Sequence, residues 1–596
     1  MKRILLMIGM AVVVVAGPAR ADWRWGNNTA APLNGDYNTT ANWNNNANSP
    51  NIPTLSNGNV YIGIGDYQPG NAGGNILTIN GTAQAQGINI GYNSPSNTLI
   101  LASGSFACNG QFNVGTGGGV YQQTGGNSTF SGGGLFVGNG GSGSATSQLL
   151  LDAGTVKTSG NGLSIGYQNN GYLRTQSGTT LDTSTAGTQS GGGGELRIGD
   201  STAGATWDFQ NGATVYVGGE LYNGVNGNGT VNQAAGTTLT VNGSLHAGYG
   251  GSGPSVWTQA GGTTTVNNEF RVGENGGATG TYNLNGGTLT VNVNGGTGYI
   301  GVGGGSTGVF NQAGGTVYVG RHGQEFNVGY SGSGTWNLGN ASVAGNVLET
   351  GTGSVNLRVR NQGTAEGTIQ GWGTWGMTGY TYMDGIVRAN GYGTDRTLDF
   401  SSFAGSGNSS IRNNMNNNLG DAHGWYAVNH GKLLLPALAV SSGNTTLNWG
   451  EDQSDSTLDL INSMRLAFNT ATAGSLSVSL LASDRTDVPG GLVNPVGVWD
   501  LAGSGGLSFS SVDLTFRYDD ILAGANESNL KLFHYVGGTW VTVPGSLDTA
   551  NNWLTATGVS SFSEFAIATG FQEIAVPEPS TILLLALGGA LLRRRR

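Results

Sequence analysis

Carboxylates are the side chains with the clearest catalytic potential in the middle of this 596-residue chain, where nine of them lie between Gly110 and Asn340. An enzyme that cleaves polysaccharides needs carboxylates held close together, often beside Arg, Lys or a metal ion. The nine acids are spread out instead: Asp152, Asp182, Glu195, Asp200, Asp208, Glu220, Glu269, Glu274 and Glu325. Pairs about one repeat apart, such as Glu195 and Glu220, could stack side by side. We expect solvated surface or loop acids and no catalytic residue.

Histidines and acid pairs are the other candidates for a metal site. The five histidines are dispersed: His246, His322, His423, His430 and His534. His423 and His430 could meet beside Asp421 as metal ligands, although polar residues of a capping loop are the favoured interpretation. The pairs Glu451-Asp452 and Asp519-Asp520 are interpreted as turn acids, because no full calcium motif surrounds them. The sequence therefore predicts no metal and no cofactor.

Three further features have an ordinary explanation beside a functional one. Cys108 is the only cysteine, which excludes an internal disulfide, and we interpret it as a small buried residue. The glycines of residues 191–194 lack the strand, Gly-Lys-Ser and helix of a phosphate-binding loop and are interpreted as turns. The runs Thr238-Leu239-Thr240 and Thr288-Leu289-Thr290 could stack into a flat threonine face that suits ice or carbohydrate. Ordinary exposed β-surface is the favoured alternative.

The elements that would position these residues come from a repeat that runs from about Phe112 to Val343. Its first phrase is an apolar residue, any residue, an apolar residue and Gly, and it occurs at 112–115, 135–138, 163–166, 196–199, 245–248, 270–273 and 326–329, with a shorter copy at 299–301. The glycines lie 23, 28, 33, 49, 25, 28 and 28 residues apart, and a further phrase at 221–224 divides the interval of 49. A second phrase, Gln followed by Gly and a Thr-rich run, begins at Gln233, Gln259 and Gln312.

This repeat predicts an all-β chain built on a parallel β-solenoid. A fixed period of this size indicates a stacked repeat, and the period-2 alternation inside each phrase indicates short strands with one face inward. A coil of about 25 residues has a perimeter near 80 Å, enough for two or three short sides. We expect coils about 4.8 Å apart, with glycines at the corners and Gln and Asn amides stacked in ladders.

Composition and the first residues indicate an exported protein. Residues 1–21 predict a signal peptide, with Lys2 and Arg3, an apolar core, and the cleavage sequence Ala19-Arg20-Ala21. The chain holds 111 glycines, and 9% of its residues are charged. Seven of the 23 basic residues and one of the 33 acidic residues lie in residues 1–21 and 577–596, which leaves a net charge of −16 for the rest of the chain. No basic patch remains, so we expect no nucleic-acid partner.

The other domains follow from shifts in composition. Residues 22–58 are rich in Trp and Asn and predict an N-terminal cap, with a glycan-binding aromatic platform as the alternative. Residues 59–344 are the solenoid repeats, and residues 345–440 are closing coils and a cap. Residues 441–570 have ordinary composition and alternating short segments, which predict a small antiparallel β-sandwich. Residues 571–596 form a tail.

The tail combines three ordered features. Pro577, Glu578 and Pro579 precede an apolar run from Ile582 to Leu592, and four arginines, Arg593, Arg594, Arg595 and Arg596, end the chain. This order resembles the PEP-CTERM sorting signal of exported bacterial proteins. The resemblance implies that an exosortase, a membrane enzyme, recognises Pro577, Glu578 and Pro579 and processes the tail. The apolar run is short for a spanning helix, so we expect the arginines to act as a transient membrane stop.

These features together predict a secreted, non-enzymatic surface or extracellular-matrix protein with a structural or adhesive role. The expected location is the cell surface or the matrix, with the tail in contact with the membrane before processing. Expected partners are the exosortase and extracellular polysaccharide or cell-envelope components. The alternative is a glycan-binding or polysaccharide-degrading β-helix protein.

Overall fold

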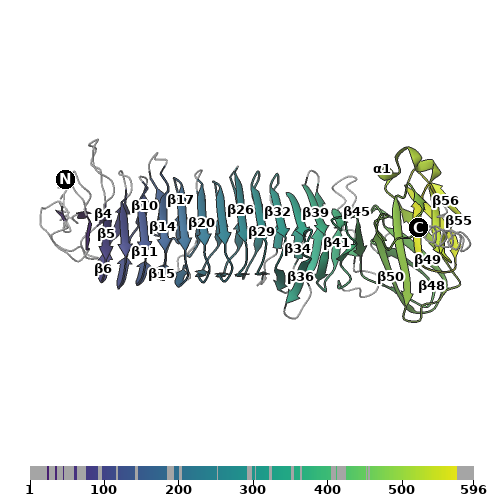
Figure 1. The fold of residues 1–596 in the computed structure, drawn as a ribbon, viewed down its shortest axis with the longest axis horizontal. Helices are drawn as coiled ribbons and strands as arrows, with labels where there is room; N and C mark the ends of the chain where they lie inside the picture. The colour runs from purple at the N-terminus through teal and green to yellow at the C-terminus, as the bar shows by residue number, and fades with distance from the viewer. Residues whose placement is uncertain are drawn as a thin grey trace, which may run out of the picture. The chain divides into compact units, whose positions relative to one another are not determined.

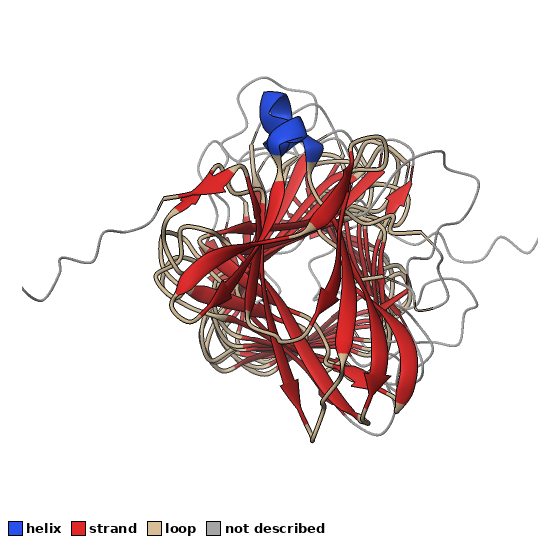
Figure 2. Ribbon diagram, turned by 90° about the vertical axis from the view of Figure 1, so that its right-hand side faces the viewer, coloured by secondary structure: helices blue, strands red, loops and turns tan. Residues whose placement is uncertain are grey.

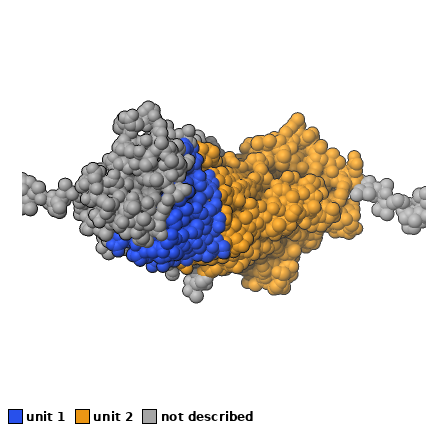
Figure 3. All heavy atoms as spheres, turned by 60° about the vertical axis from the view of Figure 1, so that its left-hand side comes forward, with its two compact units in different colours: residues 1–207 blue, residues 208–596 orange. Residues whose placement is uncertain are grey.

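The computed structural model describes residues 76–572 apart from short gaps, and four strands before residue 76 by their backbone alone. The gaps are 92–96, 116–117, 141–144, 184–193, 201–203, 252, 292–297, 302–303, 321–324, 351–354, 363–364, 404–410, 413–424, 452 and 454–456. The predicted signal peptide and sorting tail lie outside the described residues, as does most of the predicted cap. The chain divides into two compact units, residues 1–207 and residues 208–596, coloured separately in Figure 3.

The structure confirms the predicted all-β class and the parallel β-solenoid, which covers residues 76–399. Each coil contributes one strand to each of three sheets, here called A, B and C, so the solenoid has three sides. In the first unit, sheet A holds β1 (Trp23–Trp25), β3 (Asn44–Asn45), β4 (Asn59–Ile62), β7 (Gly87–Ile90), β10 (Phe112–Gly115), β13 (Leu135–Asn139), β16 (Leu163–Ile165) and β19 (Leu196–Ile198). Sheet B holds β2 (Asn34–Asp36), β5 (Ile76–Ile79), β8 (Thr98–Leu101), β11 (Val120–Gln123), β14 (Ser147–Leu151) and β17 (Gly171–Thr175). Sheet C holds β6 (Thr82–Ala85), β9 (Ser105–Cys108), β12 (Asn127–Phe130), β15 (Gly154–Thr158) and β18 (Thr179–Asp182). Figure 1 shows the strands of successive coils, such as β10 and β11, in side view.

The coils of the second unit repeat the same order of strands, after β20 (Ala205–Phe209) at the boundary. Sheet A holds β22 (Leu221–Asn223), β25 (Leu245–Ala247), β28 (Phe270–Val272), β31 (Gly298–Ile300), β34 (Glu325–Val328), β37 (Asn356–Val359), β41 (Thr381–Met383) and β44 (Ile411–Arg412). Sheet B holds β23 (Gly229–Gln233), β26 (Pro254–Gln259), β29 (Thr279–Leu284), β32 (Thr307–Gln312), β35 (Ser333–Leu338), β39 (Ala365–Gly371), β42 (Ile386–Asn390) and β45 (Trp425–Asn429), with β38 (Asn361–Gln362) beside β39. Sheet C holds β21 (Thr214–Val217), β24 (Thr238–Val241), β27 (Thr263–Val266), β30 (Thr288–Val291), β33 (Thr316–Gly320), β36 (Gly345–Thr350), β40 (Gly373–Gly376), β43 (Arg396–Asp399) and β46 (Gly431–Leu434).

Glycine sets the corner that follows sheet A in most of the described coils. Eight glycines that end the first phrase have φ between +69° and +83°: Gly138, Gly166, Gly199, Gly224, Gly248, Gly273, Gly301 and Gly329. This left-handed conformation costs other L-residues about 1–2 kcal/mol. At Gly273 an added Cβ would also lie 2.4 Å from the Thr307 carbonyl oxygen of the next coil. The predicted role of the corner glycines is therefore confirmed, and close approach of neighbouring coils adds to it.

The second phrase is explained by a buried glutamine that closes the corner between sheets B and C. The side-chain nitrogen of Gln259 donates to the carbonyl of Gly262, at 3.3 Å, and to the carbonyl of Thr288 in the next coil, at 3.0 Å. Gln123 and Gln312 make the same two kinds of bond. Each amide thus satisfies one carbonyl of its own corner and one of the following coil, which a buried apolar residue could not do.

The interior is apolar and holds a column of aromatic rings in the second unit. Trp257, Tyr282, Phe310 and Trp336 occupy one register position of sheet B and are each fully buried. Successive ring centroids lie 5.7, 5.4 and 4.5 Å apart. On the next coil Trp375 of sheet C, rather than a residue of sheet B, continues the contact at 4.7 Å from Trp336. Such distances are favourable for aromatic pairs, so the column stabilises each coil against its neighbours.

Antiparallel sheets follow the solenoid, as predicted, and their strands dominate the end-on view in Figure 2. One sheet pairs β46, β47 (Leu438–Val440), β50 (Gly474–Leu481), β52 (Gly497–Ser504), β58 (Glu564–Ala568), β54 (Lys531–Val536) and β55 (Thr539–Val543). The other orders β48 (Gly443–Trp449), β49 (Met464–Ala471), β53 (Ser511–Arg517), β57 (Trp553–Val559) and β56 (Gly545–Asp548). The remaining elements are α1 (Asp520–Ala523), the 3-10 helix η2 (Gly524–Asn529) and the pair β51 (Leu492–Val493) and β59 (Gly570–Phe571).

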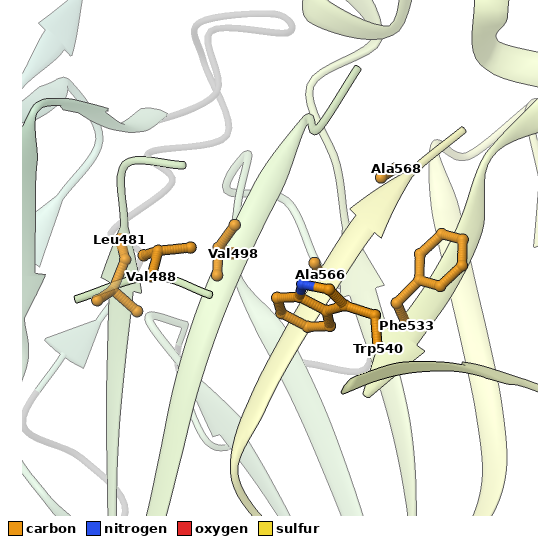
Figure 4. Close-up of a cluster of buried hydrophobic side chains, with 7 residues drawn as sticks. All are labelled: Leu481, Val488, Val498, Phe533, Trp540, Ala566 and Ala568. Carbon is orange, nitrogen blue, oxygen red and sulfur yellow. The ribbon is translucent and has the colours of Figure 1, made fainter. Parts of the chain in front are cut away.

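Aromatic contacts between these two sheets form a sandwich core. Trp499 of one sheet packs on Phe516 of the other with ring centroids 4.7 Å apart, and Phe516 lies 6.3 Å from Phe565. A separate cluster lies at the β54–β55 hairpin, where Figure 4 shows Phe533 and Trp540 near Ala566. The strand β46 pairs in parallel with β43 of the last coil and antiparallel with β50 of the sandwich. One sheet therefore continues from the solenoid into the sandwich.

Candidate functional site

The described residues bring acids, a histidine and an arginine together on the outward side of sheet A. Tyr222, His246 and Arg271 are the central residues of β22, β25 and β28 and lie in register on three successive coils. Their neighbours on each strand are buried inside the coil, so these three side chains point outward. The second residue of the first phrase, which can be of any type, therefore occupies an equivalent outward position on each of these coils.

His246 is the centre of this cluster and is only 3% exposed. Its ring stacks on Tyr222 with centroids 4.6 Å apart and meets the edge of Tyr249 at 5.3 Å. Its Nδ1 contacts the carboxylate of Glu274 on the following coil. Its Nε2 lies 3.5 Å from Oε2 of Glu220 on the preceding coil. The imidazole therefore connects three coils.

Arg271 and Tyr222 complete the cluster. Arg271 forms ion pairs with both Glu269 and Glu274, and the Tyr222 hydroxyl donates to Glu220. The cluster holds three carboxylates against one guanidinium and one imidazole. Each carboxylate has at least one cationic neighbour, and one net negative charge remains when His246 is protonated.

The charge states follow from these contacts. The adjacent His246 ring lowers the pKa of Glu220 to about 2, burial opposes this shift, and the Tyr222 hydroxyl adds to it. Burial alone would lower the pKa of His246, but its contacts with Glu220 and Glu274 outweigh burial and raise that pKa above 6.5. At neutral pH Glu220 is therefore a carboxylate. A catalytic acid needs the opposite shift, toward a raised carboxyl pKa.

The expectation of solvated surface acids is wrong for most of the nine carboxylates. Ion pairs hold Asp152 with Arg174, Glu195 and Asp200 with Arg197, and Glu325 with Arg358, in addition to the three acids around His246. Glu274 is 8% exposed. Glu195, Arg197 and Asp200 lie within six residues of one another in the sequence. The pairs Asp152–Arg174 and Glu325–Arg358 instead join adjacent coils, so the sequence alone does not show them side by side. Alignment of the first phrases by their glycines would have placed Tyr222, His246 and Arg271 in one column.

The other predicted candidates are placed as follows. Asp421, His423 and His322 lie outside the described residues. Nδ1 of His430 lies 2.9 Å from Asp484 Oδ2, beside a cavity of about 190 Å³. Asp519 accepts hydrogen bonds from the backbone of Ile521 and Leu522 and caps α1. In the part of the chain that the structure describes, no group of three His, Cys, Asp or Glu side chains is arranged to hold a metal ion.

Cys108 and the threonine runs can both be located. Cys108 is fully buried in β9, and burial raises the pKa of its thiol to about 11. The two threonine runs lie on β24 and β30 of sheet C, in register with Thr263-Thr264-Thr265 of β27 between them. The two runs therefore stack through β27, an arrangement that the sequence left open beside the favoured interpretation of ordinary β-surface.

The predicted sorting residues, Pro577, Glu578, Pro579, Arg593, Arg594, Arg595 and Arg596, lie outside the described residues. Comparison with family models decides what this tail is, because residues 575–596 match the PEP-CTERM protein-sorting motif. The tail is a PEP-CTERM sorting motif. It implies export and processing by exosortase, a membrane enzyme.

The other two comparisons give no relative. Neither the curated proteins nor the solved structures contain a match to the chain. Among the residues that the structure describes, which exclude the PEP-CTERM tail, no helix has the length and apolar character to cross a membrane.

Proposed function

We propose that this chain is a non-enzymatic protein of the cell surface or extracellular matrix with a structural or adhesive role. The observation that carries the proposal is the PEP-CTERM motif at residues 575–596, behind a β-solenoid of about 11 turns. A sorting motif delivers the chain to the envelope, and a solenoid presents long, repetitive faces there. The predicted signal peptide at residues 1–21 would begin export, and the tail would contact the membrane until exosortase processes it.

The charge pattern supports a role without turnover. The acids of sheet A are ion-paired, and Glu220 lacks the raised pKa of a proton donor. Such networks hold neighbouring coils together, because a compensated pair at a partly buried site resists separation. The cluster therefore acts as a coil-to-coil clamp in this proposal.

The alternative of a polysaccharide-degrading enzyme rests on one observation, the gathering of Glu220, His246, Arg271 and Tyr222 on one face. The purified chain should be incubated with acidic and neutral polysaccharides, and reducing ends and unsaturated products measured. We expect no turnover. Products that disappear in Glu220→Gln or His246→Gln would contradict the non-enzymatic proposal.

Delivery to the surface is tested separately in the producing cells. The unchanged chain is expected in the surface or matrix fraction. A variant with Pro577, Glu578 and Pro579 replaced by Ala is expected to stay with the membrane fraction. Equal surface amounts of both forms would contradict sorting through this motif.

A further inference from the structure

Five successive strands of sheet C present a regular face of hydroxyl groups. Strands β21, β24, β27, β30 and β33 pair in register, and alternate residues of each point away from the core. The first row consists of Thr214, Thr238, Thr263, Thr288 and Thr316. The second row consists of Tyr216, Thr240, Thr265, Thr290 and Tyr318. We call these ten residues the threonine–tyrosine face.

The spacing of this face is fixed by the backbone. Neighbouring strands lie about 4.8 Å apart, and alternate residues along a strand lie about 6.6 Å apart. The buried residues between the two rows, such as Val215, Leu239 and Val317, hold both rows against the core. The hydroxyl groups therefore form a two-dimensional lattice rather than a single line.

The hydroxyls of this face have no partner among the described residues, unlike the stacked asparagines of sheet B and the charged residues of sheet A. On sheet B, Asn311 donates to Asn283 and Asn337 donates to Asn311, so the amides satisfy one another. On sheet A, Arg271 is paired with acids. No side chain of the threonine–tyrosine face makes such a bond in the described part of the chain. These donors and acceptors are free for groups outside the chain.

The face is also uncharged. None of the five strands contains Asp, Glu, Lys, Arg or His. Glu220, His246, Glu269, Arg271 and Glu274 of the same coils lie together on sheet A instead. A charged polymer finds no opposite charge on the threonine–tyrosine face, so an uncharged partner fits it best.

Tyrosines at both ends of the second row favour a carbohydrate partner over ice. Tyr216 is 42% exposed, and Tyr318 is partly exposed at the matching position four coils later. An exposed tyrosine offers a flat apolar ring with a polar tip. A sugar ring offers the complementary flat C–H surface and hydroxyl groups. An ice lattice offers no apolar surface to the two rings.

We infer that the threonine–tyrosine face binds the surface of an ordered, uncharged polysaccharide, in which parallel sugar chains repeat their hydroxyls in two dimensions. A lattice of hydroxyls on the protein binds most tightly to a partner that is itself periodic, because each coil then adds an equivalent contact to the binding energy. This inference deepens the proposed function, since it names the kind of matrix that the surface protein would hold.

The test is adsorption of the purified full chain to particles of crystalline cellulose and crystalline chitin, compared with their amorphous forms and with soluble oligosaccharides. We expect binding to at least one crystalline particle, weaker binding to its amorphous form, and no measurable binding to the oligosaccharides. Thr265→Lys places an ammonium group in the centre of the face. It should weaken adsorption about tenfold or more, because that charge must lose water without a partner.

Thr281→Lys is the matched control, because Thr281 is a partly exposed threonine that points outward from β29 of sheet B. It should adsorb like the unchanged chain, and thermal unfolding should show that both variants are folded. Absence of binding to both crystalline particles, or equal loss in the two variants, would overturn the inference. Inhibition of ice growth by the unchanged chain but not by Thr265→Lys would assign the face to ice and overturn it as well. Surface delivery is measured in cells without added polysaccharide, so failure here leaves the proposed function standing.

Discussion

The imidazole of His246 and the carboxylate of Glu274 are in contact although 28 residues separate them in the chain. The contact exists because β25 and β28 pair in register and place the two residues on adjacent coils. With Glu220 on the other side of the ring, a single histidine joins three coils. The stability of this part of the solenoid should therefore depend on pH.

Replacement of His246 by Gln tests this dependence. The folded pKa of His246 is raised above 6.5, so its stabilisation is complete below pH 6.5 and is lost as the pH rises through the folded value. We expect His246→Gln to lower the free energy of unfolding by about 3 kcal/mol at pH 6, and by less at alkaline pH. Thermal unfolding of both proteins between pH 6 and 10 measures the difference. A difference that does not change with pH would contradict the charged clamp.

Replacement of Gln259 by Leu tests the corner glutamine. A leucine fits the position, because Leu284 occupies the equivalent place on the next coil. The change removes the bonds to the carbonyls of Gly262 and Thr288 and to the Tyr282 hydroxyl, so a loss of about 2–4 kcal/mol is expected. Because Tyr282→Phe removes the other half of one bond, the double variant should lose less than the sum of the two single variants. Strict additivity would show that the bond is unimportant.

Substitution of two glycines by alanine distinguishes the loss of stability caused by a positive φ from the loss caused by a clash with the next coil. Gly273 and Gly277 both have positive φ, but an added Cβ meets the Thr307 carbonyl at Gly273 and nothing within 4 Å at Gly277. We expect Gly277→Ala to cost about 1 kcal/mol and Gly273→Ala about 3 kcal/mol or more. Chemical unfolding of the two variants measures both values. Equal losses would mean that the neighbouring coil moves aside.

Deletion of one coil tests the repeat itself. Ala247 and Val272 are register partners, so removal of residues 248–272 joins equivalent positions and should leave a folded solenoid with a similar melting temperature. Removal of residues 248–259 alone takes away β26 and leaves β23 and β29 without their shared partner. That variant should melt at a clearly lower temperature or fail to accumulate. Equal damage in both deletions would contradict independent coils.

The tail is expected to be shortened on the cell surface. Arginines resist transfer across the membrane, so Arg593 to Arg596 should stay inside while the Pro577–Pro579 segment is processed outside. Peptide mapping of surface material should therefore lack these four residues. Recovery of intact Leu592 through Arg596 in most molecules, with or without alanines at 577–579, would contradict processing.

The periodic part of the fold was predictable because its cause is local. A glycine that ends a phrase, such as Gly248 or Gly301, is needed because its φ is positive. The apolar residues before it are needed because their side chains are buried. The parallel solenoid, the inward faces and the sandwich after it follow from such patterns, and the structure confirms them. The phrase that begins at Gln259 was visible as a repeat, but its two hydrogen bonds could not be inferred without the neighbouring coil.

The cluster around His246 was not predicted because its cause is not local. Glu220, His246 and Glu274 belong to three coils, and only the register of β22, β25 and β28 brings them together. Coil lengths vary between phrases, so counting residues along the chain does not give that register. The PEP-CTERM tail was recognisable for the opposite reason, because all of its features lie within one short segment.

The aromatic column gives the folded chain an optical signature. Trp336 and Trp375 lie on adjacent coils with ring centroids 4.7 Å apart. Two indoles at this distance share their excited states, so their near-ultraviolet circular dichroism differs from the sum of two isolated tryptophans. A slip of one coil against the next would separate the rings while leaving the amount of β-strand unchanged. The aromatic bands of the circular dichroism spectrum therefore report whether neighbouring coils are aligned, whereas the amide bands report only the amount of strand.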